Sequence, residues 1–257
     1  MKMDNDGNAE DELRPEYEEG FWKDAVRGKY ATEPVLDKYG DPRSKSVVFE
    51  KYKDIHLNEP AYVLGSGPTL NDFRVDDHPG IYFGVNDVYF LPQIENTLHY
   101  LLTDKYFPKL ALLREDFPVF CKGWPGQEQW SGMSGKSNCF FYTRSKIEKE
   151  LSDGVSLSGE IKVGEHRNGL GSIIFHGFFL ALYTGCKKIH LVGCDCDADI
   201  GVDRPHHQQD YGETYETRIR GWEIVKEFVE EHHPDVEIIS INPVNLKGMF
   251  KDERSAP

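Results

Sequence analysis

Polar and glycine-rich residues follow four short apolar stretches of the sequence. These residues are Gly65-Ser66-Gly67, Asn86-Asp87, Thr103-Asp104 and Gly193-Cys194-Asp195. A short apolar stretch bounded by such signals is typical of a buried strand. Because the carboxyl ends of parallel strands meet at one edge of a sheet, we expect the four groups to surround a crevice that holds a polar ligand.

The first group belongs to the stretch YVLGSGPTL, residues 62–70. Gly65 and Gly67 allow a tight turn and a close approach of a ligand to the backbone. Pro68 and Thr69 open the next element, where free N–H groups favour a phosphate. A simple strand-to-helix turn explains the same residues without a ligand. The stretch matches neither GxGxxG nor a P-loop, so it supports neither an NAD site nor an ordinary ATP site.

Asn86 offers a hydrogen-bond donor and an acceptor together, which suits the edge of a nucleobase or a ribose. Asparagine is also common where a strand turns, and Asp104 allows the same two interpretations. Asp87 and Thr103 are the other polar residues of these two strand ends. Polar residues at several strand ends at once favour the ligand interpretation.

Asp195 and Asp197 form a D-x-D pair at the end of an apolar stretch. Two carboxylates at this spacing can hold Mg²⁺ or Mn²⁺ against a diphosphate. In the alternative, one acid caps the loop and the other is solvated. His206 and His207 follow in the loop RPHHQQDY, where either can act as a general base near neutral pH or be an ordinary surface residue.

The most apolar stretch predicts a buried helix over residues 171–184. Gly185 stands where a C-terminal glycine cap is expected. Arg167, Gly171 and Ser172 stand at the opening of this helix, and its N-terminus is expected to face the crevice and attract an anion. His176, inside the helix, is expected to be a core residue.

Apolar strands alternate with helices from residue 61 onward. The predicted strands are 61–65, 81–87, 99–104, 118–123, 187–197 and 236–243, and a second helix is predicted over 214–232. Continuous apolar strands are typical of a parallel sheet that is covered on both faces. The sequence therefore predicts an α/β fold, a Rossmann-like, doubly wound, mainly parallel sheet with helices on both faces.

The chain divides into two parts by composition. Residues 1–56 are expected to form an acidic N-terminal extension, partly disordered and then helical. Residues 57–257 are expected to form the nucleotide-binding catalytic domain. Within it, the Gly/Ser-rich residues 124–164 are expected to be an irregular insertion or lid that shapes the pocket.

The overall composition excludes several classes of protein. A formal net charge of −14 argues against a nucleic-acid binder. Five cysteines without a pairing pattern predict buried free thiols in a reducing, cytoplasmic compartment. No apolar stretch is long enough for a membrane span, and the acidic N-terminus does not resemble a signal peptide. The oligomeric state stays open, homo-oligomers included.

Several stretches resemble the bacterial lipooligosaccharide sialyltransferases of glycosyltransferase family 42. They also resemble the related group with flagellin motility-accessory glycosyltransferases and the archaeal-type 6-hydroxymethylpterin diphosphokinase. VLGSGPTL is similar to the nucleotide-binding G-x-G-P-S-L motif, and in GVNDVYF Asn86 matches an asparagine that contacts the nucleotide. In GLGSIIFHGFFLALYTGCKKIHLVGCD, Asp195 matches the terminal acid of a G-x-D motif. INPVNLKGMF resembles the family's C-terminal motif, so the resemblance covers roughly residues 60–250.

The chain departs from the sialyltransferase pattern at three places. Gly171 and Ser172 stand in the reverse order, and Thr103-Asp104 stands where the sialyltransferases carry another asparagine. The first tyrosine after the G-x-D motif is Tyr211, which is later than the tyrosines that assist the departing phosphate in the family.

The resemblance implies a transferase that uses a CMP-, UDP- or GDP-linked sugar donor and a glycan or small alcohol acceptor. It implies His207 or His206 as the general base. One alternative is a Mg²⁺-dependent pterin diphosphokinase that uses ATP and holds the metal with Asp195 and Asp197. The other is a nucleotide-binding protein without catalytic activity.

Overall fold

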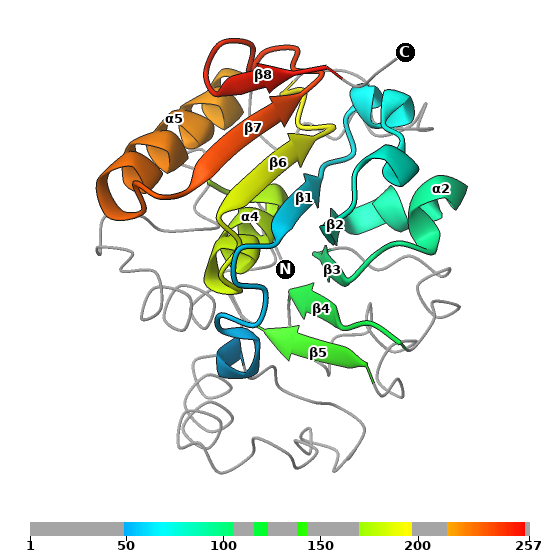
Figure 1. Cartoon of the computed structure of the whole chain (residues 1–257). Coiled ribbons are helices and arrows are strands. Elements are labelled where there is room, and N and C mark those ends of the chain that lie inside the picture. The colour runs from blue at the N-terminus through cyan, green and yellow to red at the C-terminus, as the bar shows by residue number, and fades with distance from the viewer. Residues whose placement is uncertain (1–48, 105–115, 123–137, 143–169, 197–214, 255–257) are drawn as a thin grey trace, which may run out of the picture.

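The computed structural model describes residues 49–104, 116–122, 138–142, 170–196 and 215–254. In these ranges an eight-stranded sheet forms the centre of the molecule, and all neighbouring strands are parallel (Figure 1). The strands are β1 (Pro60–Leu64), β2 (Ile81–Val85), β3 (Tyr100–Thr103), β4 (Val119–Lys122), β5 (Cys139–Tyr142), β6 (Lys188–Val192), β7 (Glu237–Ile241) and β8 (Lys251–Glu253). Their order is β5-β4-β3-β2-β1-β6-β7-β8. The predicted α/β fold with a parallel sheet is confirmed.

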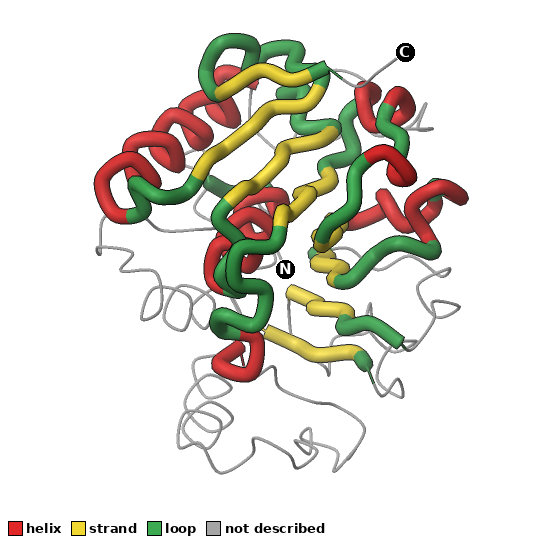
Figure 2. Tube along the Cα trace, in the orientation of Figure 1, coloured by secondary structure: helices red, strands yellow, loops and turns green. Residues whose placement is uncertain are grey.

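Helices cover both faces of this sheet. Neighbouring residues of a strand point to opposite faces, so each strand contributes side chains to two cores. Ala61 and Val63 of β1 belong to a core with the helices α4 (Ile173–Tyr183) and α5 (Tyr215–His232). Tyr62 and Leu64 belong to the core on the other face. That face is covered by α2 (Pro92–Glu95) and by the 3₁₀ helices η2 (Pro68–Asp72), η3 (Val75–Asp77) and η4 (Asn86–Phe90). Figure 2 shows the sheet as one layer between these helices.

The strand order reverses next to β1. The chain runs from β1 outward to β5 on one side and returns to β6 on the other side of β1. Open α/β sheets bind ligands at the carboxyl ends of the strands on the two sides of such a reversal. The predicted crevice therefore belongs to the ends of β1 and β6 and their neighbours.

Helix α4 lies directly on the sheet. All of its residues except Ile174 are buried, which confirms His176 as a core residue. Gly177 permits the close approach, since a Cβ there would lie 3.3 Å from Val85 Cγ1 and 3.4 Å from Val63 Cγ1. The helix ends shortly before the parallel strand β6 begins, so it runs antiparallel to the strands and starts at their carboxyl edge.

The other end of α4 is closed by a glycine and by the segment before β1. Gly185 has a φ of +93°, which confirms the predicted C-terminal cap. Three N–H groups of the earlier segment bond to the last carbonyl groups of the helix. They are Asp54 N–H to Tyr183 O at 3.1 Å, His56 N–H to Thr184 O at 2.8 Å and Asn58 N–H to Gly185 O at 3.3 Å. These bonds fix residues 54–58 to the sheet's amino edge.

Two strands differ from the sequence prediction. β5 lies inside residues 124–164, which were expected to be an irregular insertion without a strand, and its four residues lie in a Gly/Ser-rich context that hides them. β8 is the short edge strand Lys-Asp-Glu, and its exposed charged residues carry no apolar signal. Charges of this kind are common on sheet edges because they oppose pairing with other chains.

The cysteines agree with the prediction of free thiols. All five are unbridged, and Cys121 and Cys139 on the neighbouring strands β4 and β5 have Sγ atoms 3.2 Å apart. As for the membrane, none of the helices in the described ranges has the length and apolar character that a span requires. Most of the expected N-terminal extension lies outside these ranges, which begin with the 3₁₀ helix η1 (Phe49–Tyr52).

Replacing Gly185 with alanine should destabilise the protein more than the matched change Gly248→Ala. Both glycines have a positive φ, +93° and +77°, so a side chain costs about 1–2 kcal/mol at either position. Only at Gly185 would the Cβ be crowded, at 3.0 Å from Leu57 Cδ2 and 3.2 Å from Asp54 Cα, whereas nothing lies within 4 Å at Gly248. Urea unfolding measures both losses. Equal losses of stability in the two variants would contradict the close packing of residues 54–58 against the end of α4.

Candidate functional site

The strand register brings the predicted polar residues to one level of the sheet. Leu64 of β1 pairs with Gly84 of β2 and with Val192 of β6, and Val85 pairs with Leu102 of β3. Counting onward along the strands places Ser66 beside Asn86 and Cys194, and Asn86 beside Thr103. The ends of β6, β1, β2 and β3 therefore form one continuous rim.

The ends of β1 and β6 are held together by their backbones. Gly65 N–H bonds to Val192 O, and Gly67 N–H bonds to Gly193 O, both at 2.8 Å. A Cβ on Gly65 would lie 2.5 Å from Gly193 O, and one on Gly67 would lie 2.6 Å from the same oxygen. The two glycines of the predicted phosphate loop are therefore required for this strand-to-strand contact.

Ser66 is the residue of this loop that has free polar groups. Neither its N–H nor its hydroxyl has a hydrogen-bond partner in the described ranges, and the residue is half-buried. Gly65 and Gly67 direct their N–H groups to β6, and in an extended chain the residue between them directs its N–H to the other side. The Ser66 N–H therefore points to the side of β2, and the hydroxyl is a second donor on the same residue.

The start of η2 differs from the expectation of free N–H groups. Thr69 donates its N–H to Asp195 Oδ2 at 3.0 Å and its hydroxyl to Asp195 Oδ1. Pro68 has no N–H, and Leu70 N–H bonds to Gly67 O. Asp195 is only 3% exposed. Its carboxylate thus serves as the cap of η2 and ties the loop after β1 to β6.

Asn86 joins the ends of β2 and β3. Its φ of +51° is a left-handed conformation that asparagine tolerates better than most residues. Its Oδ1 accepts the Thr103 hydroxyl at 3.1 Å and the Asp104 N–H at 3.2 Å. A backbone N–H can only donate, so this atom is the amide oxygen. The Nδ2 group remains as a donor without a partner among the described residues.

Asp104 contributes an acceptor to the same rim. Its Oδ1 is buried and has no hydrogen-bond partner in the part of the chain that the structure describes. A buried acceptor without a donor is unfavourable by about 1–3 kcal/mol, so a ligand that supplies a donor gains this energy. Thr103 is fully buried and supports Asn86, while Asp87 is the second residue of η4.

The predicted anion position at the start of α4 lies at the same edge. Ser172 is the N-cap residue, is half-buried and makes no side-chain capping bond, and Gly171 is buried. The first turn contains no acidic residue. The positive end of the helix dipole therefore has no neutralising side chain in its own first turn.

Sequence reasoning missed the role of Asn245, which follows β7. Its N–H bonds to Asp195 O at 3.3 Å, and its Nδ2 bonds to Cys196 O at 3.2 Å. Cys196 has a φ of +50°, so Asn245 holds a strained turn at the end of β6. The resemblance of INPVNLKGMF to a family motif was the signal that marked this segment.

Comparisons with solved structures give glycosyltransferases, at low identity. The MAf glycosyltransferase from Magnetospirillum magneticum AMB-1 is 14% identical with a TM-score of 0.44, over 81% of this chain but only 37% of that chain. The Campylobacter jejuni sialyltransferase CstII, solved with the substrate analogue CMP-3FNeuAc, is 14% identical with a TM-score of 0.43, over 71% of this chain and 81% of that one. The monofunctional α-2,3-sialyltransferase Cst-I from the same organism is 15% identical with a TM-score of 0.43, over 71% and 75%.

No protein-family model matches the sequence, and no curated protein is significantly similar to it. The likeness to the three solved structures is at the level of the fold. The pterin diphosphokinase part of the sequence resemblance has no counterpart among these three.

The two cysteines at the end of β6 are not activated thiols. Burial raises the pKa of Cys194 well above its usual value, and burial raises the pKa of Cys196 to about 12. A nucleophilic cysteine requires the thiolate, which a raised pKa disfavours. Both side chains therefore pack in the strand end.

Four residues of the predicted site, Arg167, Asp197, His206 and His207, lie outside the described ranges. Of the two carboxylates proposed to bind a metal, the structure therefore describes Asp195 and not Asp197. Its two carboxylate oxygens accept hydrogen bonds from Thr69, and within the described ranges no cluster of three metal-ligating side chains occurs. The general base and the metal remain predictions.

Removing the Asp195 carboxylate should loosen the β1–β6 contact. In Asp195→Ala the half-buried Thr69 N–H and hydroxyl both lose their acceptor, at about 0.5–1.5 kcal/mol per hydrogen bond. Thr69→Val loses only the hydroxyl and should reduce stability less than Asp195→Ala. Thr69→Ser keeps the hydroxyl and should be about as stable as the wild type. Urea unfolding ranks the variants. A wild-type stability of Asp195→Ala would contradict the capping role.

Proposed function

We propose that this protein is a nucleotide-dependent transferase, and more specifically a glycosyltransferase that takes its sugar from a nucleotide-linked donor. One observation carries the proposal. Free donors of Ser66 and Asn86 and a buried free acceptor of Asp104 stand side by side at the strand-order reversal. A nucleotide needs both kinds of group, because its phosphate and base accept hydrogen bonds and its ribose hydroxyls donate them.

Each residue of the rim has a proposed part in donor binding. The N–H and hydroxyl of Ser66 bond to the phosphate, whose charge is also favoured by the N-terminus of α4. Asn86 Nδ2 donates to the base or ribose, and Asp104 accepts from a ribose hydroxyl. Asp195 positions the Ser66 loop through Thr69 and does not itself contact the reacting atoms.

The transfer step follows from this placement and from the sequence resemblance. The acceptor is a glycan or a small alcohol, and its hydroxyl oxygen forms a bond to the anomeric carbon of the sugar. The bond from that carbon to the phosphate oxygen breaks, and the nucleotide leaves with the bonding electrons. His207 or His206 receives the proton of the acceptor hydroxyl.

A nucleotide panel tests the donor class. CMP, UDP, GDP and ATP are compared by thermal shift, each with EDTA, Mg²⁺ or Mn²⁺. One of the three nucleotides CMP, UDP and GDP should stabilise the protein, by about 2.7 kcal/mol at a concentration of 100 Kd. Stabilisation by ATP alone, and only with a metal, would favour the diphosphokinase. Binding of a nucleotide without turnover of its sugar conjugate would indicate a non-catalytic protein.

Changing Asn86 should weaken nucleotide binding without unfolding the protein. Asn86→Gly suits the positive φ and removes the whole amide, whereas Asn86→Asp keeps an acceptor for Thr103 and Asp104 but removes the Nδ2 donor. Both should raise the Kd about fivefold to tenfold, as expected for one hydrogen bond of about 1–1.4 kcal/mol. Isothermal titration calorimetry gives the Kd.

Asn242→Gly is the matched control for this prediction. Asn242 has the same φ of +51° and also follows a strand, but that strand is β7, which is separated from β1 by β6. Its Kd for the nucleotide should equal the wild-type value. An equal weakening in Asn242→Gly and Asn86→Gly, or no weakening in either, would place the nucleotide elsewhere.

A further inference from the structure

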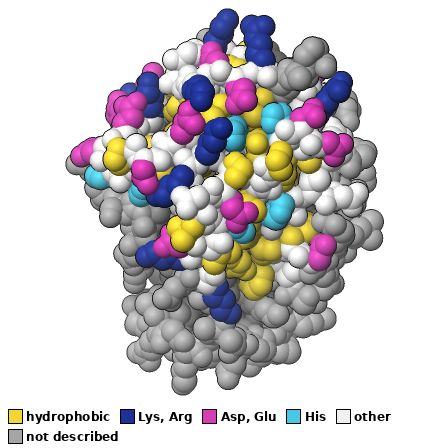
Figure 3. All heavy atoms as spheres, in the orientation of Figure 1, with side chains coloured by type: hydrophobic (Ala, Val, Ile, Leu, Met, Phe, Trp, Pro, Cys, Tyr) yellow, Lys and Arg dark blue, Asp and Glu magenta, His cyan; other side chains and the backbone are white. Residues whose placement is uncertain are grey.

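A pocket of about 530 Å³ lies at the opposite, amino edge of the sheet. Gly80 at the start of β2 and His99-Tyr100 at the start of β3 line it, together with His56, His78 and Phe117. Its size is in the range of small-molecule sites. No motif of the sequence pointed to this pocket, and the proposed transferase does not use it. Figure 3 shows histidine side chains beside hydrophobic ones on one face of the molecule.

One wall of this pocket is the end of a column of parallel rings. Tyr62 of β1 pairs in register with Tyr82 of β2 and with His190 of β6, so the three side chains point to one face of the sheet. The ring centroids of His190 and Tyr62 are 4.4 Å apart at 9°, and those of Tyr62 and Tyr82 are 5.1 Å apart at 19°. His99 follows Tyr82 at 6.1 Å and 20°.

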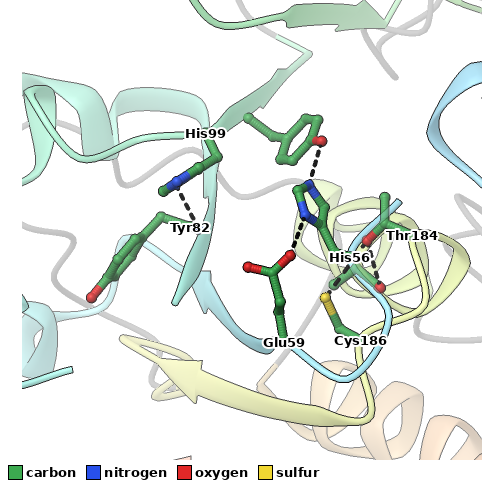
Figure 4. Close-up of polar contacts among 8 residues, drawn as sticks. His56, Glu59, Tyr82, His99, Thr184 and Cys186 are labelled. Atoms are coloured by element: carbon green, nitrogen blue, oxygen red, sulfur yellow. Dashed lines mark hydrogen bonds and ion pairs between the residues drawn. The ribbon is translucent and has the colours of Figure 1, made fainter. Parts of the chain in front are cut away.

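His99 ends the column with its ring on the pocket. The residue is exposed and lines the pocket, and Tyr82 is the one aromatic ring stacked on it among the described residues. Tyr82 N–H donates to His99 Nδ1 at 3.2 Å, which fixes the ring and leaves the proton on Nε2 (Figure 4). Loss of hydration and the nearby His56 lower the pKa of His99, which favours the neutral ring.

Polar groups with free hydrogen-bonding capacity stand around this ring. Asn96 is exposed, and its side-chain amide has no hydrogen-bond partner in the described ranges. The ring of His78 lies flat on Phe73, at 4.8 Å and 15°, and its nitrogens have no partner there either. By contrast, His56 is fixed by Glu59 at 3.1 Å and by the Tyr100 hydroxyl at 2.7 Å (Figure 4).

The charge of the lining restricts the ligand. Among the described residues that line the pocket there is no lysine or arginine, and the one acidic residue of this set is Asp116. This described lining therefore offers a phosphate no cationic partner. Leu98 and Phe117 are buried apolar residues of the same wall. The lining suits a flat, uncharged ring with polar atoms along its edge.

We propose that this pocket binds a planar heteroaromatic ring of the nucleobase class, in an uncharged base or nucleoside. The bound ring packs against the exposed part of the His99 ring at the end of the column, and Asn96 and His78 bond to its edge. An asparagine amide presents a donor and an acceptor side by side, which matches the edge of a base. This site is independent of the proposed donor site, which needs the phosphate and lies at the other edge of the sheet.

Titration with nucleosides tests the proposal, because a nucleoside lacks the phosphate on which the donor site depends. Adenosine, guanosine, cytidine and uridine are each titrated into the full chain, with saturation-transfer NMR and calorimetry as readouts. His99→Ala removes the stacking ring, and His99→Phe keeps a flat ring in its place. Both variants lose the bond to Tyr82 N–H, so their difference isolates the ring. His232→Ala is the control, since it removes an exposed histidine that packs on an aromatic ring, Phe228, on α5.

At least one nucleoside should bind, with a Kd that rises about tenfold or more in His99→Ala and stays near the wild-type value in His99→Phe and His232→Ala. Asn96→Ala should also raise the Kd. No binding of any nucleoside at millimolar concentration would overturn the proposal. So would an unchanged Kd in His99→Ala, or a Kd that responds to Asn86→Gly instead, which would place the nucleoside at the donor site.

Discussion

The close contact between the ends of β1 and β6 sets the geometry of the candidate site. Two backbone hydrogen bonds join Gly65 and Gly67 to β6, and no side chain of any size fits between these backbones. Asp195 then fastens the next turn through Thr69, and Asn245 holds β6 from the other side. The outcome is that Ser66, the residue between the two glycines, is presented to a ligand from a rigid support.

The central strands β2 and β3 contribute residues to both the amino edge and the carboxyl edge of the sheet. β2 contributes Tyr82 to the ring column at its amino end and is followed by Asn86 at its carboxyl end. β3 begins with Tyr100, which lines the pocket, and is followed by Asp104. A strand of four or five residues at about 3.3 Å per residue separates the two edges by about 15 Å. The donor site and the amino-edge pocket are therefore different surfaces of one rigid sheet.

The sequence predicted the sheet well because its strands are apolar and end in polar or glycine signals. It also predicted which strand ends meet, and Ser66, Asn86 and Asp104 were on that list. It could not show that Thr69 donates hydrogen bonds to the Asp195 carboxylate, since that contact joins residues 126 positions apart. β8 was hidden because its stability comes from backbone pairing with β7, which has no apolar pattern. The amino-edge pocket was hidden because its histidines come from separate segments without a motif.

The place of β1 in the strand order also governs when the protein can fold during synthesis. β1 pairs with β2, which follows closely, but its other neighbour is β6, so one side of this central strand stays open while the ribosome makes the residues in between. Pairing between distant segments is slow, and unpaired strand edges favour aggregation. Because Ala61, Tyr62, Val63 and Leu64 of β1 are buried in the finished core, a nascent chain that stops before β6 exposes the apolar residues of an incomplete sheet, which favours aggregation.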